Sequence, residues 1–187
     1  MKKFLSALLI LALVCSFGVS AFATSPAATP VDEEGETTAA LPETEPENVL
    51  VTKEDGETEE VFGFAICDAA TDEVEGVIPA DEVELIAVAD AEDELDEEDA
   101  AKFLEEYEKV KAIEDKVVKY FFWIDVDEDN YTVDAENYLK FVFKCKGENV
   151  EVTVNGEPME VVAVEGAEDT YFAKLTKLGA VAITCDK

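Results

Sequence analysis

The feature that most constrains this fold is a change in hydrophobic period partway along the chain. Between Asp96 and Ile113, apolar side chains recur at three- and four-residue spacing: Ala100, Phe103, Leu104, Tyr107 and Val110. This spacing predicts an amphipathic helix, which Asp96 is placed to cap. After Lys116 the apolar period becomes two and stays so to the end of the chain. We therefore expect an α+β fold in which one amphipathic helix with short strands precedes a β unit.

Six short strand-like runs follow the predicted helix: 117–124, 138–145, 150–154, 159–164, 170–175 and 180–185. Asn155-Gly156 lies between the third and fourth runs and is typical of a two-residue hairpin turn. Short strands joined by turns indicate an antiparallel sandwich or barrel, and we predict a β-sandwich-like unit over residues 117–187. Earlier strands are expected at 49–51, 61–67 and 84–88. They make residues 49–116 a strand–helix unit.

The N-terminus predicts secretion. Lys2 and Lys3 precede an apolar run, and Ala21-Phe22-Ala23 has the small residues of a signal-peptidase site, so we expect cleavage after Ala23. An uncleaved membrane anchor is the alternative, because the apolar character continues to Ala23. Residues 24–48 are rich in Thr, Pro, Ala and Glu, which indicates a disordered acidic linker. The mature chain, residues 24–187, is expected to be extracellular and to have no membrane segment.

The charge of the chain limits its partners. It has 46 acidic residues and 14 basic ones, all lysine, with no histidine and a net charge of −32. Removing residues 1–23 takes away two lysines and no acid, so the net charge becomes −34. Such a surface repels nucleic acid and anionic membranes. Neutral glycans, cations and basic protein surfaces are the partner classes that remain.

Catalysis has little support in the sequence. Ser25, in the linker, is the only serine after the signal peptide, and the cysteines have no histidine to activate them. There is no glycine-rich phosphate loop. A glycosidase-type carboxylate pair stays open, but so many acids make any one pair uninformative. We expect a non-enzymatic binding or structural module with no catalytic residue, whose ligand the sequence does not identify.

The acidic segment 125–136, DVDEDNYTVDAE, has the ligand spacing of an EF-hand calcium loop. In that register the ligands would be the side chains of Asp125, Asp127 and Asp129, the Tyr131 carbonyl and the Glu136 carboxylate. Asn130 stands where the loop requires glycine; asparagine tolerates the left-handed conformation, and we expect Asn130 to make the tight bend of this loop. Because strands flank the segment, a calcium-binding turn between strands is favoured over an EF-hand. The sequence predicts first an acidic turn and no cofactor; bound Ca²⁺ is the alternative.

Trp123 has two interpretations. If exposed on its strand beside Phe121, the indole would be a stacking platform for a neutral sugar. If buried, it would pack against the helix stripe of Phe103 and Tyr107, which is the commoner place for a large aromatic residue at strand spacing.

Three cysteines remain after the signal peptide: Cys67, Cys145 and Cys185. Cys145 and Cys185 fall on the apolar faces of predicted strands, so they are the expected disulfide if one forms in this exported chain. Three buried free thiols are the alternative.

The C-terminal half also carries a resemblance. The Asn-Gly hairpin of 150–157 is followed by the strands 160–164 and 171–183, and the aromatic strand Tyr120-Phe121-Phe122-Trp123 comes after an acidic helix. This order resembles β-rich surface modules, and small uncharacterised secreted proteins, of Gram-positive gut anaerobes. The resemblance covers most of residues 59–185. It implies a secreted accessory role and assigns no functional residue.

Overall fold

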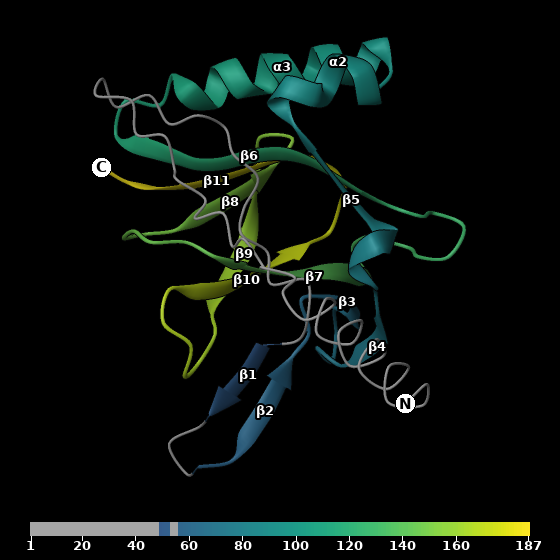
Figure 1. Ribbon diagram of the computed structural model, residues 1–187, viewed down its shortest axis with the longest axis vertical. Helices are drawn as coiled ribbons and strands as arrows, with labels where there is room; N and C mark the ends of the chain where they lie inside the picture. The colour runs from purple at the N-terminus through teal and green to yellow at the C-terminus, as the bar shows by residue number, and fades with distance from the viewer. Residues whose placement is uncertain (1–48, 53–55) are drawn as a thin grey trace, which may run out of the picture.

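The computed structural model describes residues 49–187 except 53–55 (Figure 1). The predicted signal peptide, 1–23, and the predicted linker, 24–48, lie outside the described residues. No helix in this described part of the chain is long and apolar enough to cross a membrane.

The structure is rich in β-strands. They are β1 (Val49–Thr52), β2 (Thr58–Val61), β3 (Phe64–Asp68), β4 (Val74–Val77), β5 (Val83–Ala87), β6 (Lys116–Val126), β7 (Asn137–Lys144), β8 (Glu151–Val154), β9 (Glu157–Ala163), β10 (Thr170–Leu175) and β11 (Gly179–Asp186). Two 3₁₀ turns, Ala80–Glu82 and Val88–Asp90, flank β5. The short helix α2 (Ala91–Glu94) precedes the long helix α3 (Glu97–Lys111).

Nine of these strands form one antiparallel sheet in the order β4-β3-β7-β10-β9-β8-β11-β6-β5, while β1 and β2 form a separate hairpin. Figure 1 shows this hairpin at one end of the molecule and α3 at the other. The nine-stranded sheet curls, so that one of its faces encloses the main core. The prediction of an antiparallel, β-rich fold is confirmed.

The main core lies inside the curl and draws on strands from both halves of the chain. The Phe141 ring lies at its centre, with its centroid 5.6 Å from that of Phe64 on β3, 5.6 Å from that of Phe122 on β6 and 5.5 Å from that of Phe143. Strands from both predicted units, 49–116 and 117–187, therefore share one sheet and one core.

The strands from β6 to β11 do not separate into the two facing sheets of a sandwich. Hydrogen bonding runs without a break from β7 through β10, β9, β8 and β11 to β6. A sandwich and a curled sheet both require one apolar face along each strand, so the alternating pattern of the sequence does not distinguish them.

Helix α3 covers the outer face of β6 and β11, as the amphipathic pattern predicts. Asp96 caps it, because Oδ1 accepts hydrogen bonds from the backbone N–H groups of Glu98 and Asp99, both at 2.9 Å. The Phe103 ring stacks on Phe121 of β6 with centroids 5.0 Å apart. This contact belongs to a second apolar cluster, which is separated from the main core by the sheet itself.

Candidate functional site

Trp123 lies on the outer face of β6, between the sheet and α3. Alternate residues of β6 point to opposite faces, so Phe122 and Ile124 enter the main core while Phe121 and Trp123 face the helix. The indole is half-buried and meets the Phe103 ring edge-on, with centroids 6.1 Å apart and planes at 89°. The packing that the sequence suggests against Phe103 is present, but part of the indole stays accessible.

The accessible part of Trp123 lines a groove of about 310 Å³. The other lining residues are Asp99, Lys102, Glu105, Glu106 and Lys109 of α3, and Asn155 of the β8–β9 turn. Among the described residues no group accepts a hydrogen bond from the indole N–H, and no buried side-chain nitrogen lacks a partner. The N–H therefore faces solvent and is available to a ligand.

The groove is nearly neutral in charge. Its three carboxylates and two lysines sum to −1, compared with −32 for the whole chain. Two ion pairs within α3 offset most of the charge of the carboxylates. Lys102 Nζ lies 3.2 Å from Asp99 Oδ1, and Lys109 Nζ lies 3.0 Å from Glu105 Oε1. The lining of the groove therefore lacks the strong negative charge that the chain has as a whole.

The hairpin turn forms a fixed wall of the groove. Asn155 and Gly156 have φ values of 51° and 77°, the pair of positive angles that a type I′ turn requires. The Asn155 amide is held at both ends, because Nδ2 donates to the Leu178 carbonyl at 3.0 Å and Oδ1 accepts from the Ala180 N–H at 2.9 Å. A Cβ at Gly156 would lie 2.8 Å from Oε1 of Glu106, so glycine is required for that carboxylate to approach the turn.

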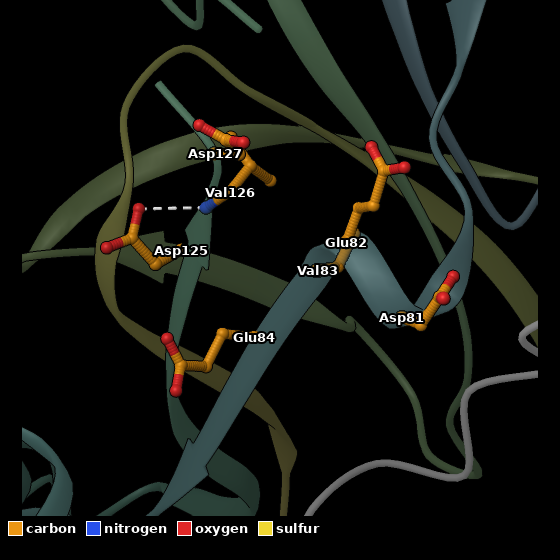
Figure 2. Close-up of a pocket in the computed structure, with 7 residues that line it drawn as sticks. All are labelled: Asp81, Glu82, Val83, Glu84, Asp125, Val126 and Asp127. Atoms are coloured by element: carbon orange, nitrogen blue, oxygen red, sulfur yellow. Dashed lines mark hydrogen bonds between the residues drawn. The ribbon is translucent and has the colours of Figure 1, made fainter. Parts of the chain in front are cut away.

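A second depression, of about 520 Å³, is strongly acidic (Figure 2). Five of its seven lining residues are acidic: Asp81, Glu82, Glu84, Asp125 and Asp127. Glu84 of β5 is directly opposite Asp125 of β6 in the strand register, and Figure 2 shows both side chains on the same side of the ladder. Like charges in this position repel each other and destabilise the strand pair.

Three residues of the predicted calcium loop, Asp125, Tyr131 and Glu136, have separate hydrogen-bond partners. Asp125 Oδ1 accepts a hydrogen bond from the neighbouring Val126 N–H at 2.8 Å. Tyr131 donates its hydroxyl to Glu82 at 2.5 Å, and this bond is the main cause of its raised pKa. The Glu136 carbonyl accepts from the Ala69 N–H at 2.8 Å, beside a different part of the sheet.

Asp127 and Asp129 of the predicted ligand set instead belong to a compact turn. Asp127 Oδ1 accepts from the Asp129 N–H at 3.0 Å, and its Oδ2 accepts from Asn130 Nδ2 at 2.7 Å. Asn130 lies in the tight turn, where its N–H donates to the Asp127 carbonyl at 3.0 Å, and it is not among the described residues with positive φ. The side-chain hydrogen bonds to Asp127 shape the turn without a left-handed residue at position 130.

Within the described residues, no group of three or more His, Cys, Asp or Glu side chains is arranged to hold a metal ion. The calcium hypothesis stays a prediction.

The three cysteines are buried as free thiols. Burial raises the pKa of Cys145 to about 11, and the neighbouring Cys185 is the second cause. Cys185 also packs beneath Gly147, where an added Cβ would lie 2.4 Å from its sulfur. The structure thus brings Cys145 and Cys185 within electrostatic reach of each other, and their disulfide stays a prediction.

A polar network that the sequence did not suggest joins β3, β7 and β10. Tyr138, only 3% exposed, donates its hydroxyl to Asp72 Oδ1 at 3.1 Å and contacts the Cys67 thiol. Lys174 Nζ lies 2.9 Å from the same Asp72 oxygen and 5.3 Å from the centre of the Tyr138 ring. Burial raises the pKa of both Tyr138 and Cys67. The network is suited to holding the β3–β4 turn in place, since neither group is activated as a nucleophile.

Comparison with known proteins adds no relative: no family model, curated protein or solved structure matches this chain.

Proposed function

We propose that this chain is a secreted, non-enzymatic α+β binding module that acts outside the cell or at the envelope. The signal-like N-terminus, the extreme acidity and the lack of histidine support this proposal. A module of this kind fits the resemblance to secreted β-rich proteins of Gram-positive gut anaerobes.

The observation that carries the binding role is the groove at Trp123, and its proposed ligand is a neutral glycan. A sugar ring has an apolar C–H face and a rim of hydroxyl groups. The exposed part of the indole suits the apolar face, as amphipathic aromatic rings do at wet interfaces. The carboxylates of Asp99 and Glu106 and the indole N–H offer hydrogen bonds to the hydroxyl groups. The groove volume is at the lower end of the usual range for ligand pockets, which suits one or two sugar rings.

Fluorescence tests this proposal directly, because Trp123 is the only tryptophan in the chain. We expect neutral oligosaccharides, such as β-glucan and chitin fragments, to shift its emission and protect it from acrylamide quenching. Glu106→Gln should weaken binding while leaving the emission of the free protein nearly unchanged. Glu108→Gln, on the same helix but outside the groove, is the matched control. An emission that no glycan changes at millimolar concentration would refute the glycan proposal.

Calcium binding at the acidic depression is the second candidate function. The observation that favours it is the opposition of Glu84 and Asp125 on paired strands, with Asp127 and Glu82 nearby (Figure 2). A hard divalent cation with oxygen ligands would offset this repulsion. These carboxylates line one depression but are not arranged as a ligand set, so the proposed ion would have to draw Asp125 and Asp127 together with carboxylates that lie about 40 residues earlier in the chain.

Thermal melting tests the calcium proposal. Millimolar Ca²⁺ should raise the melting midpoint of the native chain by more than the same concentration of Mg²⁺, and Asp125→Asn should remove the difference. Glu108→Gln, on α3, serves again as the control for loss of one charge. Equal midpoints in the two salts would exclude a specific calcium site.

A further inference from the structure

Strand β4 is an open edge of the nine-stranded sheet. It pairs with β3 on one side, and no other described strand pairs with its far side. Three large apolar side chains are exposed among the described residues, and two of them are on this strand: Val74 at 41% and Val77 at 46%. Edge strands are usually protected by lysine or by covering elements, so exposed valines on an edge indicate a place where another chain can pair.

A bulge places these two valines on the same face of the sheet. In the register of β3 with β4, Val77 is opposite Ala65 and Val74 is opposite Cys67, with a shift between Ile66 and Cys67. Ala65 and Cys67 are two residues apart, so they point to one face, and their partners point there with them. Without the extra residue, Val74 and Val77 would lie on opposite faces.

The two valines lie opposite two residues of a small buried cluster. Ala65 and Cys67 belong to a small cluster with Tyr138, against which Phe62 packs. The edge therefore offers both requirements for adding a strand: unpaired backbone groups and an apolar shelf beside them for alternate side chains. Pro79, which has no N–H, limits the available edge to the residues before it.

The carboxylates on and beside β4 indicate the charge of the segment that would bind there. Glu73 and Glu75 are exposed and form no ion pair with any described residue. A second copy of this chain would bring the same carboxylates against each other at a net charge of −32 per chain. The linker 24–48 has no basic residue, so it cannot pair with Glu73 and Glu75 either.

We propose that β4 binds an extended, lysine- or arginine-rich segment of a partner protein, which adds to the sheet as a further antiparallel strand. Its apolar side chains pack on Val74 and Val77, and its basic side chains pair with Glu73 and Glu75. This proposal does not depend on the Trp123 groove.

Binding of a designed peptide tests the proposal. The probe is a ten-residue peptide of alternating lysine and valine, titrated into the isotope-labelled protein and followed by amide chemical shifts. We expect shifts confined to β4 and the adjoining part of β3. Val74→Ser with Val77→Ser should weaken binding about tenfold, because less apolar area is buried. Ile113→Ser removes the third exposed apolar side chain, at 46%, and should leave binding unchanged.

Two further peptides separate strand addition from simple charge attraction, with no change to the protein. An N-methylated form of the probe keeps the charge but loses its backbone donors, so we expect it to bind at least tenfold more weakly. A glutamate–valine peptide should not bind. Equal binding of the N-methylated peptide, equal binding to the double serine variant, or shifts spread over the acidic surface would each overturn the proposal. Dimers of the free protein in sedimentation would also overturn it, in favour of a second copy at this edge.

Discussion

Two acidic turns in this molecule are built alike locally but are anchored differently. In the β3–β4 turn, Asp68 Oδ1 accepts the backbone N–H groups of Ala70 and Thr71, both at 2.8 Å. In the turn after β6, Asp127 plays the same part towards Asp129. In each turn an aspartate side chain accepts backbone N–H groups and so adds to the backbone hydrogen bonds of the turn.

The difference lies in the link to the rest of the fold. The β3–β4 turn is tied to β10 by the ion pair between Asp72 and Lys174, and to β7 by Tyr138. The turn after β6 has Tyr131 bonded to Glu82 and no ion pair with a described lysine. One lysine from β10 therefore lets the chain bury a polar network under the first turn, whereas the second turn stays open to solvent and to ions.

The largest expected effect comes from removing the hydroxyl of Tyr138 on β7, which anchors the β3–β4 turn. Tyr138→Phe removes the hydroxyl that contacts buried Cys67 and donates to Asp72, which keeps its ion pair with Lys174, so we expect about 1–2 kcal/mol less free energy of unfolding in urea. Tyr131→Phe is the matched change at the exposed turn and should give no resolvable shift of the urea midpoint. Equal losses in the two variants would show that the difference in anchoring has no energetic consequence.

A smaller effect is expected from Lys174→Met, which keeps most of the side-chain volume but removes the charge. Hydrogen exchange should become about fivefold faster at the amides of Ala70 and Thr71, because the turn opens locally without global unfolding. The amides of Asp129 and Asn130 should be unaffected. Faster exchange in both turns would indicate that Lys174 stabilises the whole sheet and does not act specifically on the β3–β4 turn.

The sequence predicted the elements that depend on local pattern. Helix α3 was expected from its apolar stripe and the Asp96 cap, and the β8–β9 hairpin from Asn155-Gly156. Strand β4 was missed, because Val-Glu-Gly-Val has neither a clear alternation nor a high strand propensity. The predicted strand 61–67 is in fact divided at Phe62-Gly63 between β2 and β3.

Features that depend on distant pairing could not be predicted. Glu84 meets Asp125 only because β5 pairs with β6, and no spacing in the sequence indicates this. Lys174 and Asp72 are 102 positions apart. Strand pairing also determines whether alternating strands form a sandwich or one curled sheet. The sequence therefore identified Trp123 as a candidate, while the groove around it required the position of α3 and of the β8–β9 turn.

The smallest expected effect is a difference in response to acid within the β3–β4 turn. Hydrogen bonds from Thr71 lower the pKa of Asp68, and the bond from Lys174 is the first cause that lowers that of Asp72. A carboxyl whose folded pKa lies below its unfolded value, about 3.9, adds stability above that value and loses it as the pH falls through the folded pKa. Carboxyl resonances of Asp68 and Asp72 should therefore titrate below pH 3.9, and Lys174→Met should move only Asp72 upward. Titration of both residues at the ordinary value would show that these hydrogen bonds do not persist in solution, and the contrast between the two turns would fail with them.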